Sequence, residues 1–407
     1  MSAVFGRASE PLMAVSASGC WITDAVGRRY LDASGGAVVT GIGHGRQEVI
    51  TALTAQLEQL DYVHASAFTS RITEDYCRSV AEIVPISHAR VYPVSGGSEA
   101  TETVLKMARA YQAAQGRTER SVMVGLEASY HGNTLGALDL SGRPQVRAPY
   151  ESWLGRFRHV PLDVGRLEEE LDRGDVAAFV AEPISGATRA AEVPPPDYWP
   201  AVAELCRRRE VLLVVDEVMT GFGRTGRWFG IEHWDVEPDL MICGKGASSG
   251  YWPLGLAIAS GRVYEAIREN FVHGFTYSHH PAGAAVGKAV LEIIVGEGLV
   301  EAAARQGALL RSRLEDSLSD RVIDIRGKGL LIGIELDADP KAVVSAARAQ
   351  GLLVYPAATG AILLGPPLII TDPEIDQLVD RLTAALFLPP KGGELEAPLG
   401  PLGHSPQ

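Results

Sequence analysis

The sequence predicts an α/β protein whose main sheet is mostly parallel and carries helices on both faces, with a smaller α+β domain beside it. Three short apolar runs support this prediction: VAAFVA at 176–181, VLLVV at 211–215 and DLMIC at 239–243. None of them alternates polar with apolar residues, which is typical of strands that are covered on both faces. A helical stretch at 198–209 separates the first two runs, so their order is that of a β-α-β unit.

The composition indicates a folded chain of two or three domains. The 407 residues are 46% hydrophobic and 21% charged, a balance that excludes intrinsic disorder. Acidic side chains outnumber basic ones by 50 to 37, which gives a formal charge of −13. This excess argues against a nucleic-acid partner or an anionic membrane surface, because both require a basic face. We find no signal-peptide pattern and no apolar run long enough to span a bilayer, so we expect no membrane partner.

The cysteines indicate neither a disulfide framework nor a metal site. They lie far apart in the sequence, with no CxxC pair and no ligand-like spacing to histidine. Reduced thiols of this kind are typical of a cytosolic protein. We therefore expect a cytoplasmic protein without a bound metal. The four cysteines are Cys20, Cys77, Cys206 and Cys243.

The remaining elements fall on either side of the central strands. A glycine-rich stretch at 31–45 precedes an amphipathic helix at 46–60. Later in the chain, a helical stretch at 282–298 leads into helices that alternate with short strands at 330–336 and 361–364. We expect four regions: an N-terminal segment at 1–45 that joins the small domain, a large domain at 46–282, the small domain at 283–388, and a disordered tail rich in Pro and Gly at 389–407.

Each central apolar run is followed by an ionisable residue. Glu182 follows the first run, Asp216 and Glu217 follow the second, and Lys245 lies two residues after the third. Ligands of open α/β sheets gather at the carboxyl ends of the strands. We therefore expect one ionisable group from each strand end to share a single site, although any one of them alone could be a solvated strand-end residue.

A GGS turn at 96–98 joins an apolar stretch at 90–94 to a helical stretch at 99–114. Backbone N–H groups, a hydroxyl and the positive end of the helix dipole together form a phosphate cradle. The alternative is an ordinary serine N-cap. The turn does not have the spacing of a Walker loop, and GIGHG at 41–45 lacks the third glycine of a dinucleotide fingerprint. The phosphate therefore belongs to a ligand other than ATP or NAD.

A carboxylate, a lysine and a phosphate cradle together match the chemical handles of pyridoxal phosphate (PLP), namely its ring nitrogen, its aldehyde and its phosphate. Lys245 lies between two glycines at a buried strand end. Burial there lowers the pKa of the amine and favours the free base that forms Schiff bases. The ring of Tyr130, within SYHGN at 129–133, offers a face on which the cofactor ring can stack.

The same segments resemble the class III, or ω-type, PLP-dependent aminotransferases, whose fold is PLP-dependent transferase fold type I. DEVMTGFGRTG at 216–226 resembles the signature of that family. The likeness covers nearly the whole chain, and the motifs follow the order of the family. They are YLDASGGAVVTGIGHG, SGGSEATETVLKMAR, SYHGNTLGAL, AEPISG, DEVMTGFGRTG, GKGASSGYWPLGLAIAS, HGFTYSHHPAGAAVGKA and ILLGPPLIIT.

The resemblance implies a role for each matched residue. Lys245 would form the internal aldimine and move the proton, and Asp216 would keep the ring nitrogen protonated. Tyr130 and Val218 would pack against the two faces of the ring. Gly97 and Ser98 would bind the phosphate, and Phe275 and Thr276 would reach the phosphate of the partner subunit. Glu182 would lie near the ring hydroxyl and the substrate. His131 would lie beside the ring or only support its loop.

One position departs from the family pattern. Many members have an arginine shortly before the final PPL segment, where it binds the substrate carboxylate, and here the corresponding position is Tyr355. A tyrosine donates one hydrogen bond but cannot form a charged bidentate pair. Arg143, Arg147 and Arg156 are candidate replacements, or else surface residues. A bulky or non-standard acceptor is compatible with this departure.

The resemblance implies an aminotransferase that moves an amino group from an amino acid or amine donor to a ketone or aldehyde acceptor through a pyridoxamine intermediate. Two alternatives stay open. A PLP-dependent decarboxylase, racemase or aminomutase would contain the same Lys245 and Asp216, and a catalytically silent homologue would act in binding or regulation. Because Thr276 is implied at the phosphate of a partner, we expect a homodimer with its active sites at the interface.

Overall fold

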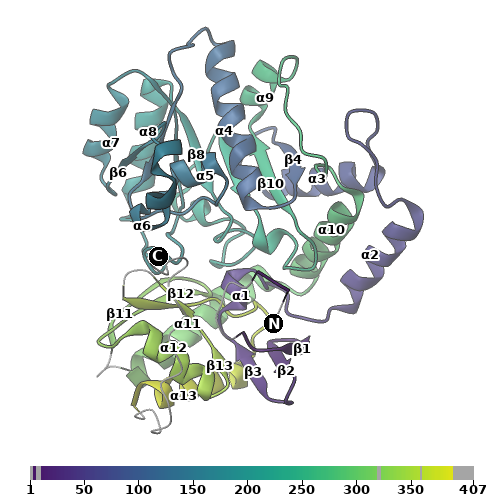
Figure 1. Ribbon diagram of the computed structural model, residues 1–407, viewed down its shortest axis with the longest axis vertical. Helices are drawn as coiled ribbons and strands as arrows, with labels where there is room; N and C mark the ends of the chain where they lie inside the picture. Colours follow the sequence, from purple (N-terminus) through teal and green to yellow (C-terminus); the bar gives the residue numbers. More distant parts are fainter. Residues whose placement is uncertain (1–2, 6–10, 319–321, 358–359, 388–407) are drawn as a thin grey trace.

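The computed structural model describes residues 3–5, 11–318, 322–357 and 360–387, and the tail predicted at 389–407 lies outside these ranges. Its upper lobe contains a seven-stranded sheet of order β4-β10-β9-β8-β7-β5-β6 (Figure 1). β10 is antiparallel to both of its neighbours, and the other four pairs are parallel. The strands are β4 (Arg90–Val94), β5 (Val122–Leu126), β6 (Arg158–Val160), β7 (Val176–Ala181), β8 (Leu212–Asp216), β9 (Leu240–Cys243) and β10 (Gly255–Ala259).

Helices surround this sheet and continue into the lower lobe (Figure 1). Among the described residues, no helix combines the length and the apolar character needed to cross a membrane. The α-helices are α1 (Gly35–Val38), α2 (Gln47–Gln59), α3 (Arg71–Ile83), α4 (Gly97–Ala114), α5 (Leu135–Leu140), α6 (Pro144–Arg147), α7 (Val164–Leu171), α8 (Tyr198–Arg209), α9 (Gly261–Ile267), α10 (Pro281–Gly296), α11 (Leu299–Leu318), α12 (Pro340–Ala349) and α13 (Asp372–Phe387). The 3₁₀ helices are η1 (Ala148–Trp153), η2 (Gly230–Trp234) and η3 (Lys245–Ala247).

The central strands are buried on both faces because alternate residues pack into two different cores. On β8, Leu213 and Val215 join one core together with Trp199 of α8. Val214 faces the opposite way and joins a second core with Val104 of α4. Successive side chains of a strand point to opposite faces of the sheet, so a strand with a core on each side must be apolar at every position.

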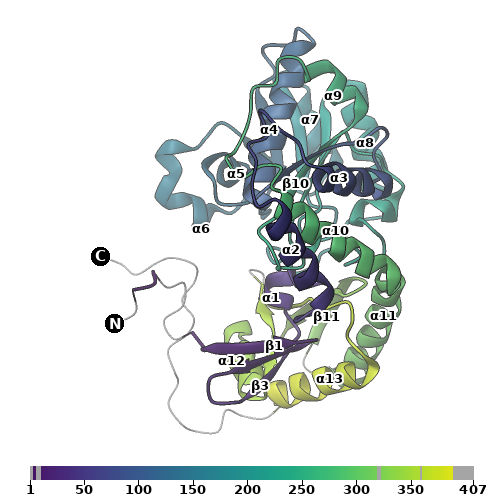
Figure 2. The same ribbon diagram turned by 90° about the vertical axis from the view of Figure 1, so that its right-hand side faces the viewer.

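Two four-stranded sheets lie in the lower lobe, and Figure 2 shows α10 and α11 leading from the upper lobe to it. One sheet is antiparallel, with the order β11-β12-β15-β14. The other has the order β1-β2-β3-β13, and in it Leu31 of β3 pairs in parallel with Leu352 of β13. Segments from the two halves of the chain therefore lie side by side. The strands are β1 (Ala14–Ser18), β2 (Trp21–Asp24), β3 (Arg29–Asp32), β11 (Val322–Lys328), β12 (Leu331–Leu336), β13 (Leu352–Leu353), β14 (Tyr355–Pro356) and β15 (Ala361–Leu364).

The elements that the sequence predicts are present in the structure. The strands at 176–181 and 361–364 and the helix at 198–209 have the predicted bounds. The other predicted helices and strands begin and end within two residues of their expected positions. These are the helices expected at 46–60, 99–114 and 282–298 and the strands expected at 211–215, 239–243 and 330–336.

The bounds of β8 differ from the predicted 211–215 for a local reason. The backbone N–H of Val211 donates to the carbonyl of Cys206, so Val211 belongs to the turn that ends α8. At the other end, Asp216 continues the ladder and pairs with Ile242 of β9. The strand therefore delivers its carboxylate as its own last residue, at the edge of the sheet.

Candidate active site

The carboxyl ends of β7, β8 and β9 lead to a cavity of about 610 Å³. These strands are parallel neighbours, so their carboxyl ends meet at one edge of the sheet. The loop at 129–133 and the N-terminus of α4 also line the cavity. The sequence-predicted site residues that line it are Gly97, Ser98, Tyr130, His131, Arg143, Glu182, Asp216, Val218, Lys245 and Tyr355.

The N-terminus of α4 faces the cavity and offers a site for an anion. A Cβ added at Gly96 would meet no atom within 4 Å, whereas one at Gly97 would lie 3.3 Å from both methyl carbons of Val218. The first N–H groups of an α-helix have no partner within the helix, and α4 continues for 18 residues. Glycines at 96 and 97 keep these groups accessible, which suits a phosphate.

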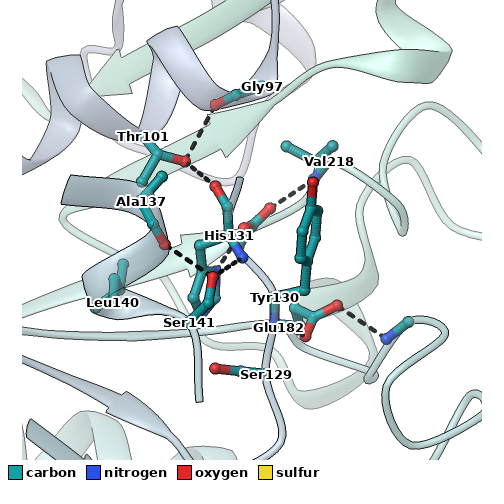
Figure 3. A network of polar contacts seen from close by, with 12 residues as sticks. Gly97, Thr101, Ser129, Tyr130, His131, Ala137, Leu140, Ser141, Glu182 and Val218 are labelled. Carbon is teal, nitrogen blue, oxygen red and sulfur yellow. Dashed lines mark hydrogen bonds and ion pairs between the residues drawn. The ribbon is translucent and has the colours of Figure 1, made fainter. Parts of the chain in front are cut away.

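Close contacts fix the loop at 129–133 against the start of α4. Gly132 has a φ of 129°, and a Cβ at this position would lie 2.5 Å from Ser98 Oγ. The hydroxyl of Thr101 lies 3.1 Å from the carbonyl oxygen of Gly97 and 2.8 Å from that of His131 (Figure 3). The anion site and the loop that carries Tyr130 therefore form one unit.

Asp216 is held in a fixed orientation at the end of β8. His131 Nδ1 lies 2.7 Å from Asp216 Oδ2, and the backbone N–H of Val218 donates to Oδ1 at 3.0 Å. The imidazole of His131 is fully buried, and its backbone N–H donates to Ser141 Oγ at 2.9 Å. Among the described residues, His131 Nε2 is buried without a hydrogen-bond partner. Because these two contacts fix the Asp216 carboxylate, the lone pairs that remain free on its oxygens keep a constant direction.

Lys245 begins η3, directly after Gly244. Its φ of 41° is left-handed, a conformation that costs about 1 kcal/mol or more for a residue with a Cβ and that is frequent at functional sites. Burial lowers the pKa of the Lys245 amine, against the opposing effect of the Asp216 and Glu182 carboxylates, and the charge of Arg224 adds to the decrease. A lowered pKa increases the fraction of uncharged, nucleophilic amine near neutral pH.

Glu182 connects the end of β7 to the loop that carries Tyr130. Its Oε1 accepts from the backbone N–H of Gly186 at 2.9 Å, and its Oε2 accepts from that of Tyr130 at 3.4 Å. Figure 3 shows Glu182 beside Tyr130. Burial raises the pKa of Glu182 to about 7, with His131 opposing this shift and the charge of Asp216 adding to it. The cavity therefore contains a carboxyl group that changes its protonation near neutral pH.

Glu217 is the member of the Asp216-Glu217 pair that does not line the cavity. It is fully buried, and its carboxylate accepts from the backbone N–H groups of Gly230 and Ile231, both at 2.8 Å, and from the hydroxyl of Thr220. Burial raises the pKa of Glu217 to about 7. Its contacts anchor η2 to the end of β8, which is a structural role.

Of the three candidate arginines, the structure brings Arg143 to the cavity and places the other two elsewhere. The guanidinium of Arg147 is buried and donates to the carbonyl and the carboxylate of Asp139, at 2.6 and 3.2 Å. Arg156 is exposed, and its backbone N–H donates to the same carboxylate at 2.8 Å. Neither Arg147 nor Arg156 lines the cavity, so their geometry does not support substrate binding.

Phe275 and Thr276 lie away from the cavity of their own chain. The ring of Phe275 packs edge-on against His273, with 4.9 Å between the ring centroids. The carbonyl of Thr276 accepts from the hydroxyl of Tyr62 at 2.9 Å, and its side chain is exposed. Neither residue is among those that line the cavity of this chain.

The cavity also contains residues to which the sequence analysis assigned no role. Trp252 and Leu363 add apolar surface, and both lie within motifs that the resemblance includes, so the motifs contained a usable signal. Thr188 lines the cavity with a buried hydroxyl that has no partner among the described residues, and no motif pointed to it. Within the described ranges, no three His, Cys, Asp or Glu side chains are grouped to hold a metal.

The geometry fits pyridoxal phosphate. An anion site at a helix N-terminus, an oriented carboxylate and an amine of lowered pKa line one cavity. Those are the three protein groups that the phosphate, ring nitrogen and aldehyde of this cofactor require. The glycines at 96 and 97 leave room for the phosphate because neither adds a side chain at this end of the cavity.

Comparisons with known proteins identify relatives over nearly the whole chain. The chain is 36% identical to an uncharacterized aminotransferase, YodT, of Bacillus subtilis, over 89% of this chain and 92% of the relative. It is also 36% identical to an acetylornithine aminotransferase of Methanothermobacter thermautotrophicus, over 92% and 93%. The crystal structure of an amine transaminase from an uncultivated Pseudomonas species, with PLP bound, superposes with a TM-score of 0.89 at 33% identity. This match covers 95% of this chain and 97% of the other.

The family model for aminotransferase class-III matches residues 4–386. This match spans both lobes and includes all the cavity residues described above. The sequence resemblance to this family is confirmed, as are the fold class and the cofactor that it implies. The chain therefore belongs to the class III aminotransferases and is a PLP-dependent enzyme of fold type I that transfers amino groups.

Proposed function

We propose that Lys245, Asp216, Gly97 and Ser98 are the residues with which this enzyme binds its cofactor and transfers an amino group. The observation that carries the proposal is the pairing of an amine and an oriented carboxylate in one cavity. Lys245 has a lowered pKa, and Asp216 is held by His131 at 2.7 Å. When bound, the cofactor supplies an aldehyde that takes up the amino group and a ring that withdraws electrons from the substrate carbon.

Each of these side chains then has a defined task. The amine Nζ of Lys245 holds the cofactor and afterwards carries the proton between substrate and cofactor carbons. The carboxylate of Asp216 stabilises a proton on the ring nitrogen. Tyr130 and Val218 line the cavity beside these two groups and confine the planar ring between them. Gly97 and Ser98, at the start of α4, bind the phosphate.

We further propose that the active unit is a homodimer in which Phe275 and Thr276 complete the phosphate site of the partner. Three observations support this arrangement. Thr276 does not line the cavity of its own chain, its side chain is exposed, and the same segment exposes the large apolar residues Val272 and Tyr277. Exposed apolar residues close together in a segment are typical of a surface that another chain covers.

The cytoplasm is the compartment that we propose for this enzyme. All four cysteines are free thiols, and free thiols persist where the surroundings are reducing. Immunodetection of the enzyme in fractionated cells of its source tests this assignment, and recovery in a secreted or periplasmic fraction contradicts it.

The decisive experiment is reduction of the PLP-loaded enzyme with borohydride, followed by peptide mapping. The chain has six lysines, so the position of the reduced cofactor adduct is unambiguous. We expect the adduct on Lys245 and none in the variant Lys245→Ala. An adduct on another lysine of the wild-type enzyme, or none, overturns the assignment.

The reaction class is tested by mixing the loaded enzyme with L-alanine, L-glutamate or 1-phenylethylamine without an acceptor. Amino-group transfer releases the matching keto acid or ketone and converts the cofactor to its amine form, which changes its visible absorption. Release of carbon dioxide, or inversion at the α-carbon without a keto product, would instead support a decarboxylase or a racemase.

A further inference from the structure

The cavity contains few charged groups, and this limits how it can recognise a substrate. The positively charged side chains that line it, among the described residues, are Lys245 and Arg143. Lys245 serves the cofactor in the function proposed above. Arg143 is therefore the cation left for a substrate, and a substrate carboxylate needs such a cation when water is excluded from the cavity.

Arg143 is partly buried and has no anionic partner within the described part of the chain. It is the N-cap residue of α6, and its guanidinium carbon lies 6.0 Å from the centroid of the Tyr130 ring. This contact with an aromatic face leaves the N–H groups of the guanidinium available. Arg147, four residues later, differs because Asp139 already occupies its guanidinium.

The wall formed by β14 and β15 provides no cation. Tyr355 of β14 pairs with Leu363 of β15, and both line the cavity. No arginine occurs between Arg348 and Arg381, so the segment before the final PPL supplies no arginine to the cavity. Leu363 is fully buried, so this wall suits an apolar substituent.

Thr188 supplies a second, independent indication of a polar ligand. Its side chain is 4% exposed, lines the cavity, and has a hydroxyl without a partner within the described ranges. A buried hydroxyl that makes no hydrogen bond costs free energy. It belongs to the loop after Gly186, and Glu182 connects that loop to Tyr130 through hydrogen bonds of 2.9 and 3.4 Å.

We propose that Arg143 binds the carboxylate of an amino acid or keto acid substrate with an apolar side chain, and that Thr188 donates a further hydrogen bond. The apolar side chain lies against Leu363 and Trp252, which line the cavity. This inference rests on the proposed function, because it assigns a specificity-determining residue to that same site. We therefore expect the enzyme to prefer small substrates that carry a carboxylate over simple amines.

The test compares Arg143→Leu with Arg156→Leu, which removes the same charge from an exposed residue of the same region. KM and kcat are measured for L-alanine as donor and, separately, for 1-phenylethylamine, which has no carboxylate. For Arg143→Leu we expect kcat/KM for alanine to fall about 10- to 100-fold, mostly through KM, because a charge-assisted hydrogen-bond pair is lost. For 1-phenylethylamine, we expect kcat/KM to fall less than about threefold.

Arg143→Lys and Thr188→Val refine the test. Lysine keeps the positive charge but lacks the planar guanidinium that binds a carboxylate through two hydrogen bonds. We therefore expect kcat/KM for alanine in Arg143→Lys to lie between the values of wild type and Arg143→Leu. Valine keeps the shape of threonine without its hydroxyl, and we expect the KM for alanine to rise about 3- to 10-fold. Arg156→Leu should behave as wild type with both donors. If Arg143→Leu affects alanine and the amine equally, Arg143 supports the Tyr130 loop and the proposal is wrong.

Calorimetric titration of the loaded enzyme with propionate, a carboxylate that cannot be transaminated, gives a readout without turnover. We expect propionate to bind wild type and Arg156→Leu, and to bind Arg143→Leu at least about tenfold more weakly. Propionamide, which is neutral, should bind all three equally weakly. Equal binding of propionate to all three overturns the role of Arg143, whereas absence of transamination by the wild-type enzyme with every donor overturns the proposed function instead.

Discussion

At the scale of single residues, His131 lines the cavity and holds the carboxylate of Asp216. Its ring is fully buried and lies 2.7 Å from Oδ2, and its backbone is fixed by Ser141. Without the imidazole, the buried carboxylate of Asp216 would keep the backbone N–H of Val218 as a hydrogen-bond donor. We therefore assign His131 as a positioning residue for the ring nitrogen site.

For His131→Ala we expect kcat to fall about 10- to 100-fold with little change in KM for the amino donor, because Asp216 is no longer held in place. The variant His131→Asn should recover part of the loss, since its amide nitrogen can donate from about the position of Nδ1. Steady-state kinetics of both variants measure this. If His131→Ala and the wild-type enzyme have the same kcat, Asp216 is oriented without His131.

The raised pKa of Glu182 predicts a pH dependence of stability. The ordinary pKa of a glutamate is 4.5, and that of Glu182 in the folded chain is about 7. At pH values between these two, the folded chain keeps a proton on Glu182 that the unfolded chain releases. The contribution of Glu182 to the free energy of unfolding is therefore fully present below pH ~4.5. It is lost as the pH rises through ~7, by up to about 3 kcal/mol.

Urea unfolding at several pH values should show a shallower decline of the free energy of unfolding with pH for Glu182→Gln than for wild type. Glu82→Gln, an exposed control, should parallel wild type, and a parallel curve for Glu182→Gln contradicts the prediction.

At the scale of elements, the proposed phosphate site at the start of α4 predicts that this helix start determines how tightly the cofactor is held. A methyl group at Gly97 would lie 3.3 Å from the Val218 methyl carbons, so the helix start or Val218 must move. We expect Gly97→Ala to weaken PLP binding at least about tenfold, measured by titrating the cofactor-free enzyme. The control is Gly296→Ala, at the end of α10, where an added Cβ meets no atom within 4 Å. Unchanged PLP affinity in Gly97→Ala argues against a phosphate at this helix.

Elements with one strong local signal were predictable from the sequence. β7 and α8 have the predicted bounds because the length of each segment decides between strand and helix: the 6 apolar residues of β7 suit a covered strand, and the 12 residues of α8 suit a helix. β6 was not predicted, because its three residues, Arg158–Val160, carry too little periodicity. The N-terminal segment was expected to join the small domain, but the specific pairing of β3 with β13 was not predicted, because it depends on a contact between distant parts of the chain.

The site was predictable where a residue follows a strand or a helix start, and less so elsewhere. Lys245 and Asp216 are placed in the cavity by strands that the sequence identifies. Arg143 and Arg147 have the same chemistry and lie four residues apart, and only the contact of Arg147 with Asp139 distinguishes them. Such a tertiary contact leaves no trace in local composition.

At the scale of the whole molecule, a shared active site predicts that two inactive variants restore each other. Lys245→Ala lacks the nucleophile, and Thr276→Asp places a negative charge where the partner's phosphate is proposed to bind. Unfolding and refolding the two together should restore about one quarter of wild-type activity, because half of the dimers are mixed and each has one intact site. Each variant alone should stay inactive. Absence of restored activity in a confirmed mixed dimer contradicts a site shared between subunits.

The parallel pairing of Leu31 with Leu352 has a consequence for how the protein is made. The ribosome adds about 5–20 residues per second, so β3 waits tens of seconds before β13 exists to pair with it. During that interval one edge of an early-formed sheet stays open to strands of other nascent chains. The sheet that contains β3 and β13 is therefore completed only after most of the chain has been made.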